Sequence, residues 1–270
     1  MSDSRLRWPV DGHVHFHELD RVAPTLDAAA TNFRAVRPSS DGLLGALLLS
    51  QTVGETVFEE LLGAGHAGEW TFSQVRGEEE SLIARRGHWA VVIVCGRQVR
   101  TSNGLEILAL GTRDVFADGL PFAESVNAVQ KSGALTVLPW GFGKWTGARR
   151  RQVESALNAD TGRGLLLGDN GGRPWLMGSP SLIRRYRQRG FGVLPGTDPL
   201  WLSTDHRRAG SFGFLAEIAP NETAPWRELR AWIATAGASL ESYGRACGAV
   251  RFTLNQLGLR LNRRPVSAAR

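Results

Sequence analysis

Short apolar runs alternate with amphipathic segments along the first two-thirds of the chain. The runs predict strands at 7–10, 43–49, 70–75, 81–84, 89–94, 105–110, 135–138, 165–167 and 192–194. The segments between them predict helices at 25–36, 54–62, 121–131, 147–157 and 180–189. Between 69 and 111 the strands follow one another through glycine-containing turns, which favours hairpins over parallel crossovers. This order predicts a barrel or a wound sheet with an antiparallel insertion.

The last third of the chain has a different pattern. Amphipathic helices are predicted at 226–236 and 249–261, and no clear linker separates them from the preceding segments. We therefore expect a barrel over residues 1–205 and a helical extension over 206–262 that packs on it. Residues 263–270 form a basic tail that we expect to be disordered.

The composition is that of an ordinary globular protein, with 42% apolar and 21% charged residues. The two cysteines, Cys95 and Cys247, are too few for a disulfide framework or a cysteine-based zinc site. Together with the lack of an apolar leader segment, they favour a cytoplasmic protein. No apolar run reaches the ~20 residues that a membrane helix needs, so we expect no membrane partner.

The net charge of +6 comes almost wholly from arginine, because Lys131 and Lys144 are the only lysines. The planar guanidinium binds phosphate groups well, so the expected partner is a small anionic substrate or ligand. Nucleic acid is a less favoured partner, because the clusters at 149–151 and 184–189 fall on predicted surface helices. A solvated basic face explains those clusters more simply. The oligomeric state stays open.

The densest candidate chemistry lies in the run Asp11-Gly-His13-Val-His15-Phe-His17, directly after the first predicted strand. Side chains alternate along a strand, so the carboxylate and the three imidazoles would share one side. Such a set at the carboxyl end of a strand is typical of a divalent metal site. A polar, solvated strand face is the alternative interpretation.

Polar residues and glycines also follow several later predicted strands. The candidates at these strand ends are Gln98, Glu106, Trp140, Lys144, Asp169, Asn170, Arg173 and Asp198, and Arg207 lies just beyond the last of them. In an α/β barrel, the loops at the carboxyl ends of the strands meet at one face, where reacting groups gather. The Asp-Asn-Gly-Gly sequence at 169–172 is also a good turn in its own right.

The opening run resembles the first motif of the PHP phosphoesterase domain, a metal-binding barrel whose pattern is Asp-x-His-x-His. Three later stretches, at 94–111, 133–140 and 192–200, are similar to further motifs of that family and follow in the same order. The resemblance covers roughly residues 8–203. It implies an α/β fold: a distorted (β/α) barrel of the PHP and amidohydrolase type, with an antiparallel hairpin insertion and C-terminal helices.

By this resemblance, His13, His15 and Asp198 stand at metal-ligand positions and keep the ligand type. Other ligand positions are changed, since the chain has Gln98 for a bridging glutamate, Glu106, Trp140 and Leu200 for histidines, and Ser50-Gln51-Thr52 for the second motif. The resemblance therefore implies one divalent ion (zinc, manganese or iron) rather than a dinuclear or trinuclear centre. Glu106 is a further candidate ligand.

Two functions follow from this set. The first is a mononuclear metal-dependent hydrolase of phosphoesters, in which the ion lowers the pKa of its bound water toward ~7. Its candidate catalytic residues are Glu106 and Asp169 as proton acceptors and Arg173 as an anion-binding group, and its candidate substrate-binding residues are Trp140, Lys144, Asn170 and Arg207. The second is a catalytically inactive barrel that binds a small anionic ligand or a protein partner, with Trp140 and Trp145 lining an aromatic pocket.

Overall fold

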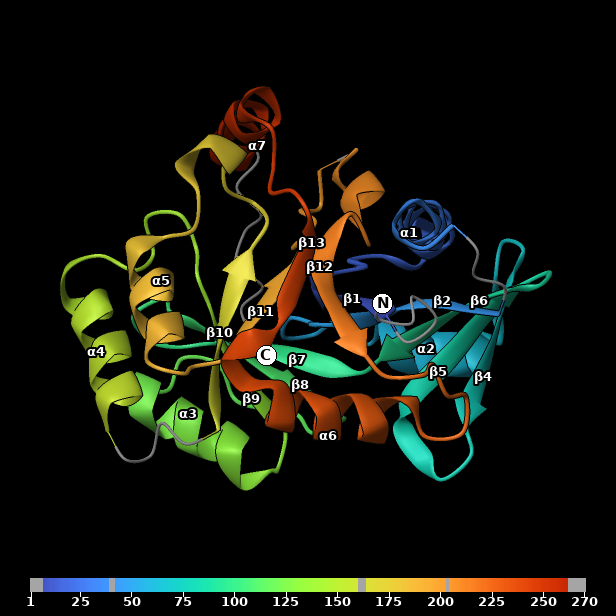
Figure 1. Ribbon diagram of the computed structural model, residues 1–270, viewed down its shortest axis with the longest axis horizontal. Helices are drawn as coiled ribbons and strands as arrows, with labels where there is room; N and C mark the ends of the chain where they lie inside the picture. Colours follow the sequence, from blue (N-terminus) through green and yellow to red (C-terminus); the bar gives the residue numbers. More distant parts are fainter. Residues whose placement is uncertain (1–6, 39–41, 160–163, 203, 262–270) are drawn as a thin grey trace.

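Two open mixed sheets, one of eight strands and one of five, form the centre of the protein (Figure 1). The computed structural model describes residues 7–38, 42–159, 164–202 and 204–261. The first sheet contains, in spatial order, β13 (Glu241–Gly244), β12 (Phe212–Glu217), β1 (Arg7–Val14), β2 (Gly42–Leu49), β6 (Trp89–Val94), β5 (Glu78–Arg86), β4 (Trp70–Val75) and β3 (His66–Ala67). The second contains β11 (Val193–Gly196), β10 (Leu165–Asn170), β9 (Leu135–Pro139), β8 (Glu106–Leu110) and β7 (Gly96–Arg100).

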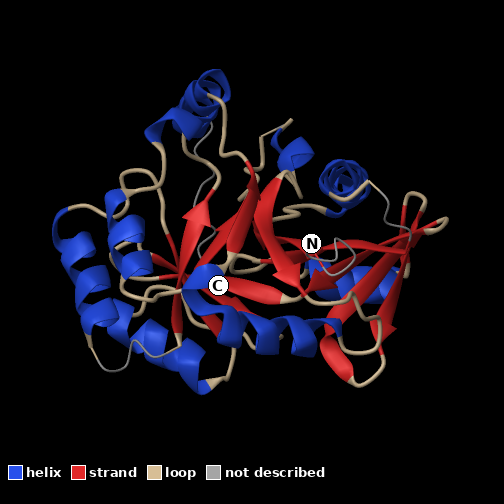
Figure 2. Ribbon diagram, viewed as in Figure 1, coloured by secondary structure: helices blue, strands red, loops and turns tan. Residues whose placement is uncertain are grey.

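Helices cover the outer faces of both sheets (Figure 2). Apolar side chains of α1 (Val22–Val36) and α2 (Val57–Ala64) pack on the first sheet. The second sheet packs against α3 (Phe122–Lys131), α4 (Gly147–Asn158) and α5 (Ser181–Gln188). The remaining helices are α6 (Pro225–Ala236), α7 (Ala249–Leu261) and the 3-10 turns η2 (Leu19–Arg21), η4 (Trp175–Met177), η5 (Asp205–Arg208) and η6 (Gly237–Ser239).

A third apolar core lies between the two sheets, and α6 closes one edge of it. β2 and β6 are buried along nearly their whole length, which explains why they read as continuous apolar runs rather than as alternating strands. The resulting order of layers is helices, sheet, sheet, helices. None of the helices in the described part of the chain is long and apolar enough to cross a membrane.

The predicted barrel is wrong, because neither sheet closes on itself among the described strands. β1 pairs in parallel with β2 on one side and antiparallel with β12 on the other. The hairpins predicted between 69 and 111 are confirmed, because β4 pairs with β5, β5 with β6 and β7 with β8, each time antiparallel. They are not an insertion into a barrel, since they belong to the two sheets and β6 also pairs in parallel with β2. Alternation of strands and helices is shared by barrels and open sheets, so the local pattern did not distinguish them.

The C-terminal part of the chain contributes more than helices. Besides α6 and α7, residues 206–261 contain β12 and β13, which extend the first sheet on the far side of β1. Neither strand was predicted. The basic tail at 263–270 lies outside the described residues.

The two sheets come into close contact at the carboxyl ends of β1 and β11. A Cβ atom on Gly12 would lie 2.7 Å from the carbonyl oxygen of Pro195, and one on Gly196 would lie 2.3 Å from the backbone nitrogen of His13. Glycine is required at both positions, since any side chain would push the strands apart. The residues that follow β1 and β11 are therefore brought together, although they belong to different sheets.

Candidate metal centre

The Asp11 side chain binds the backbone around the end of β1 and belongs to none of the groups of ligand-type side chains described below. Its buried carboxylate accepts hydrogen bonds from the Thr197 N–H (2.8 Å), the Thr197 hydroxyl (2.6 Å), the Gly210 N–H (2.8 Å) and the His13 N–H (3.3 Å). Burial raises the pKa of Asp11 to about 6, against the lowering effect of these four bonds. The carboxylate therefore holds the loop after β11 and the start of β12 against β1.

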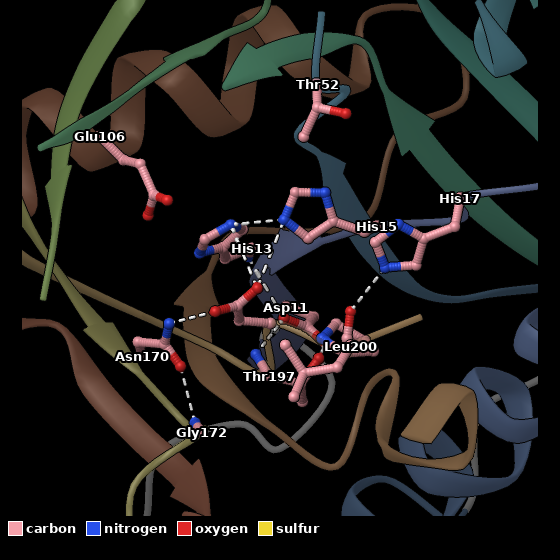
Figure 3. Close-up of polar contacts among 12 residues, drawn as sticks. Asp11, His13, His15, His17, Thr52, Glu106, Asn170, Gly172, Thr197 and Leu200 are labelled. Carbon is pink, nitrogen blue, oxygen red and sulfur yellow. Dashed lines mark hydrogen bonds and ion pairs between the residues drawn. The ribbon is translucent and has the colours of Figure 1, made fainter. Parts of the chain in front are cut away.

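Two imidazoles and one carboxylate converge beside this anchor (Figure 3). His13 Nε2 lies 3.0 Å from His15 Nε2 and 3.7 Å from Asp198 Oδ1, and His15 Nε2 lies 3.3 Å from the same oxygen. Both histidines are buried, and the Asp198 side chain is 20% exposed, so the group opens to solvent on the aspartate side. This triad could hold a metal ion, as predicted.

Burial and mutual contact shift the pKa of each member of the triad. Burial lowers the pKa of His13 to about 4, so its imidazole is neutral and keeps a lone pair at neutral pH. Burial alone would raise the pKa of Asp198, but the neighbouring His13 and His15 hold it well below its usual range. Burial would likewise lower the pKa of His15, and the carboxylate of Asp198 raises it instead.

Asp198 reaches the triad through an unusual backbone conformation. Its φ of 46° lies in the left-handed region, which aspartate tolerates better than most residues. Asn170, at the end of β10, donates a side-chain hydrogen bond to Asp198 Oδ2, and its own Oδ1 accepts one from the Gly172 N–H at 2.7 Å. Asn170 was predicted to bind substrate, and the geometry gives it the role of orienting Asp198.

Strands β7 and β8 add polar groups around the triad. Gln98 lies close to His13 and partly offsets the lowering of its pKa by burial. The carboxylate of Glu106 is directed toward the triad in Figure 3, and the Lys144 ammonium forms an ion pair with it. Glu106 and Lys144 therefore both lie at the site where the sequence placed them, as partners of each other.

The other predicted site residues lie outside this group. Asp169 and Arg173 are buried and form a two-bond ion pair, with Nε–Oδ1 at 3.1 Å and Nη2–Oδ2 at 2.7 Å. Each is therefore satisfied by the other. Trp140 packs partly buried against the core beneath α3, α4 and α5, where Trp145 is buried, and Arg207 is exposed on η5.

A second group of ligand-type side chains adjoins the first and was missed by the sequence reasoning. His15, His17 and Glu55 offer atoms that all lie within 4.8 Å of one another. Glu55 stands in the loop between β2 and α2 and belongs to none of the motifs quoted above. A carboxylate soon after the carboxyl end of a buried strand was the one signal that could have identified it.

Comparison with protein-family models and with curated proteins finds no match to this chain. Among solved structures, the chain is similar to PsfC from Pseudomonas syringae PB-5123, with a TM-score of 0.56 and 14% sequence identity. The similarity covers 94% of this chain and 99% of that chain. At this level of identity it shows a likeness of fold alone, and the resemblance to the PHP family stays a prediction.

Proposed function

We propose that the protein is a metal-dependent hydrolase of phosphoesters, with a divalent ion (zinc, manganese or iron) on His13, His15 and Asp198. The observation that carries the proposal is the convergence of two imidazole nitrogens and one carboxylate oxygen within 3.0–3.7 Å of one another. Two nitrogens and one oxygen, with an open side toward solvent, are typical of a catalytic metal site rather than a structural one.

An ion on this triad would supply Lewis acidity and a water that loses its proton near neutral pH. The surrounding residues position the ligands. Asn170 orients Asp198, and Asp11 holds the backbone of His13. Partners of this kind fix the direction of each ligand and raise the affinity for the ion.

Glu106 is the proposed proton acceptor, because its carboxylate faces the triad from β8. Lys144 is the proposed phosphate-binding group, because its ammonium lies beside Glu106 with the side chain 38% exposed. Asp169 and Arg173 receive a structural role in this proposal instead of the catalytic one predicted from the sequence. Trp140 and Arg207 stay predictions as substrate contacts.

The reducing, cytoplasmic compartment also stays a proposal. It agrees with Cys95 and Cys247, which are both buried free thiols.

The test is hydrolysis of a general phosphodiester, bis(p-nitrophenyl) phosphate, by protein purified without chelator or histidine tag. We expect turnover with Mn²⁺, Zn²⁺ or Fe²⁺ that EDTA abolishes. His13→Ala and Asp198→Asn should lose it, whereas His88→Ala, at an exposed histidine remote in the sequence, should keep it. A metal-loaded protein that leaves the diester intact would overturn the hydrolase and favour a binder of small anions.

A further inference from the structure

We propose a second divalent-cation site, formed by His15, His17 and Glu55, in which the imidazole of His15 bridges the two ions. The proposal rests on the proposed function for the first ion and adds two ligands, His17 and Glu55, that the family resemblance does not contain. The proposed centre would then hold two ions. The two added ligands lie outside the motif positions at which this chain differs from the family.

The geometry of His17 and Glu55 is the first observation. His17 Nδ1 lies 3.4 Å from Glu55 Oε1, and both side chains are 15% exposed. The rings of His15 and His17 are stacked, with centroids 5.1 Å apart and planes 12° from parallel. The φ of His17 is 62°, so its ring is held in place by a backbone conformation that a histidine seldom adopts.

The tautomer of His17 is the second observation. Its Nε2 lies 3.0 Å from the carbonyl oxygen of Pro199, which can only accept, so Nε2 carries the proton. In a neutral ring, Nδ1 then carries no proton, and its lone pair faces the carboxylate oxygen of Glu55. Two acceptors do not face each other stably unless a cation lies between them or Nδ1 is itself protonated.

The carboxylate of Glu55 is oriented so that one of its oxygens is available to a cation. Its second oxygen, Oε2, accepts a hydrogen bond from the Thr52 N–H at 2.7 Å, which leaves Oε1 for another partner. With Oε2 held by the main chain, Oε1 is directed at His17 Nδ1, 3.4 Å away.

The surroundings of His15 Nδ1 are the third observation. Its Nε2 faces His13 and Asp198, whereas its Nδ1 is buried and has no hydrogen-bond partner among the described residues. In Figure 3 the ring edge that carries Nδ1 points toward Thr52, whose N–H holds Glu55. An unpartnered buried nitrogen is costly, and a metal ion would satisfy it. Binding through both nitrogens requires the ring to release its N–H proton to solvent.

Glu55 lines a pocket of about 180 Å³, whereas His15 and His17 line a separate, smaller one. The larger pocket is also lined by Thr52 and Gln98. A small anionic group in the larger pocket would therefore approach the second ion from the Glu55 side.

The experiment is a metal titration of the full chain, purified without chelator or tag, with bound Zn²⁺ measured by elemental analysis. We expect two equivalents in the parent protein and one in both Glu55→Gln and His17→Gln. Glu60→Gln, at an exposed glutamate on α2, is the matched control and should keep two. Asp198→Asn should also keep one equivalent, held at the second site.

Loading with Cu²⁺ tests the bridge separately. Two Cu²⁺ ions joined through one imidazolate couple magnetically, so the double-integrated electron paramagnetic resonance signal should fall below that of two isolated ions. Glu55→Gln should restore the full signal of one Cu²⁺. Two equivalents with an uncoupled signal would overturn the bridging role of His15.

A single equivalent in the parent protein that Glu55→Gln does not alter would overturn the second site and leave the proposed function standing. That outcome would assign the His17–Glu55 contact to an ion pair with a protonated imidazole. A parent protein whose bound metal is indifferent to His13→Ala and Asp198→Asn would instead defeat the proposed function. Thermal unfolding of each variant shows that lost metal reflects a lost ligand rather than a lost fold.

Discussion

The backbone N–H of Asp198 donates a 2.8 Å hydrogen bond to the carbonyl oxygen of His13. His13 lies near the end of β1 in the first sheet, and Asp198 follows β11 in the second. The two proposed metal ligands are therefore connected through the main chain as well as through their side chains. A site built in this way depends on how closely the two sheets approach each other.

Gly196→Ala tests that dependence. The added Cβ would meet the backbone nitrogen of His13 at 2.3 Å, so the strands must separate. We expect a loss of about 1–3 kcal/mol in the free energy of unfolding, together with weaker metal binding. Gly63→Ala in α2, where a Cβ meets nothing within 4 Å, is the control. It should leave metal binding unchanged and raise stability by up to ~1 kcal/mol. Denaturant titration and metal titration measure both quantities, and equal metal affinity in the two variants would contradict the argument.

Asp11→Asn tests the anchor beneath the site. The carboxylate accepts from four donors, and the amide that replaces it turns an NH₂ group toward some of them. We expect the protein to lose roughly 1–3 kcal/mol of stability for the donors left without an acceptor. Asp20→Asn, at an exposed position in η2, should have almost no effect. Chemical denaturation provides the measurement, and comparable curves for both variants would refute the anchoring role.

Asn170→Ala tests the orientation of Asp198. Without the amide, the carboxylate loses the hydrogen bond that holds Oδ2, while the ligand itself remains. Metal affinity should fall by about 10–100-fold, as is typical when a partner of a ligand is removed. Asn127→Ala, at an exposed position on α3, serves as the control. An unchanged dissociation constant for Zn²⁺ in Asn170→Ala would show that Asp198 does not depend on this contact.

The pattern of apolar and polar residues predicted the positions of helices and strands better than it predicted which strands pair. The apolar runs of β2 and β6 and the helical periods of α3 and α5 were found, because burial of whole faces leaves a strong local signal. β12 was missed since Phe212–Glu217 is short and contains glycine, and β13 has four residues. Which strands pair is decided by contacts distant in sequence, so the order β12-β1-β2-β6 left no local trace.

The sequence likewise predicted part of the candidate site and missed the rest. His13, His15 and Asp198 belong to segments with a recognisable ligand pattern, and the structure brings them together. Glu55 lies in a loop with no such pattern, and its approach to His17 depends on the path of the chain after β2. The ion pair of Asp169 and Arg173 could not be foreseen, because polar residues at a strand end look alike whether they face a site or each other.

Glu78 caps α6 from a neighbouring strand. Its two carboxylate oxygens accept the N–H groups of Trp226 (2.8 Å) and Arg227 (3.0 Å) at the start of the helix. Glu78→Ala leaves these donors without an acceptor and should cost about 1–3 kcal/mol in unfolding free energy. Glu79→Ala, at the exposed position beside it, should cost little. Calorimetry compares the two variants, and equal unfolding temperatures would contradict the capping role.

The cysteines report on the integrity of the fold. Burial raises the pKa of Cys95 to about 12 and raises that of Cys247 as well, so neither thiol ionises near neutral pH. Both should resist Ellman's reagent at pH 8 in the folded protein and react promptly in denaturant. Because the thiolate is the reactive form, labelling should accelerate as the pH rises. Rapid labelling of the folded protein at pH 8 would show that these side chains are exposed.

The most direct test of the account is an anomalous difference map from crystals of the protein grown with Mn²⁺ or Zn²⁺ and no chelator. The account predicts a peak at ~2.0–2.2 Å from His13 Nε2, His15 Nε2 and an oxygen of Asp198, the bond lengths expected for such a centre. Density that leaves these three side chains in contact with one another, with the metal absent or bound elsewhere, would contradict it.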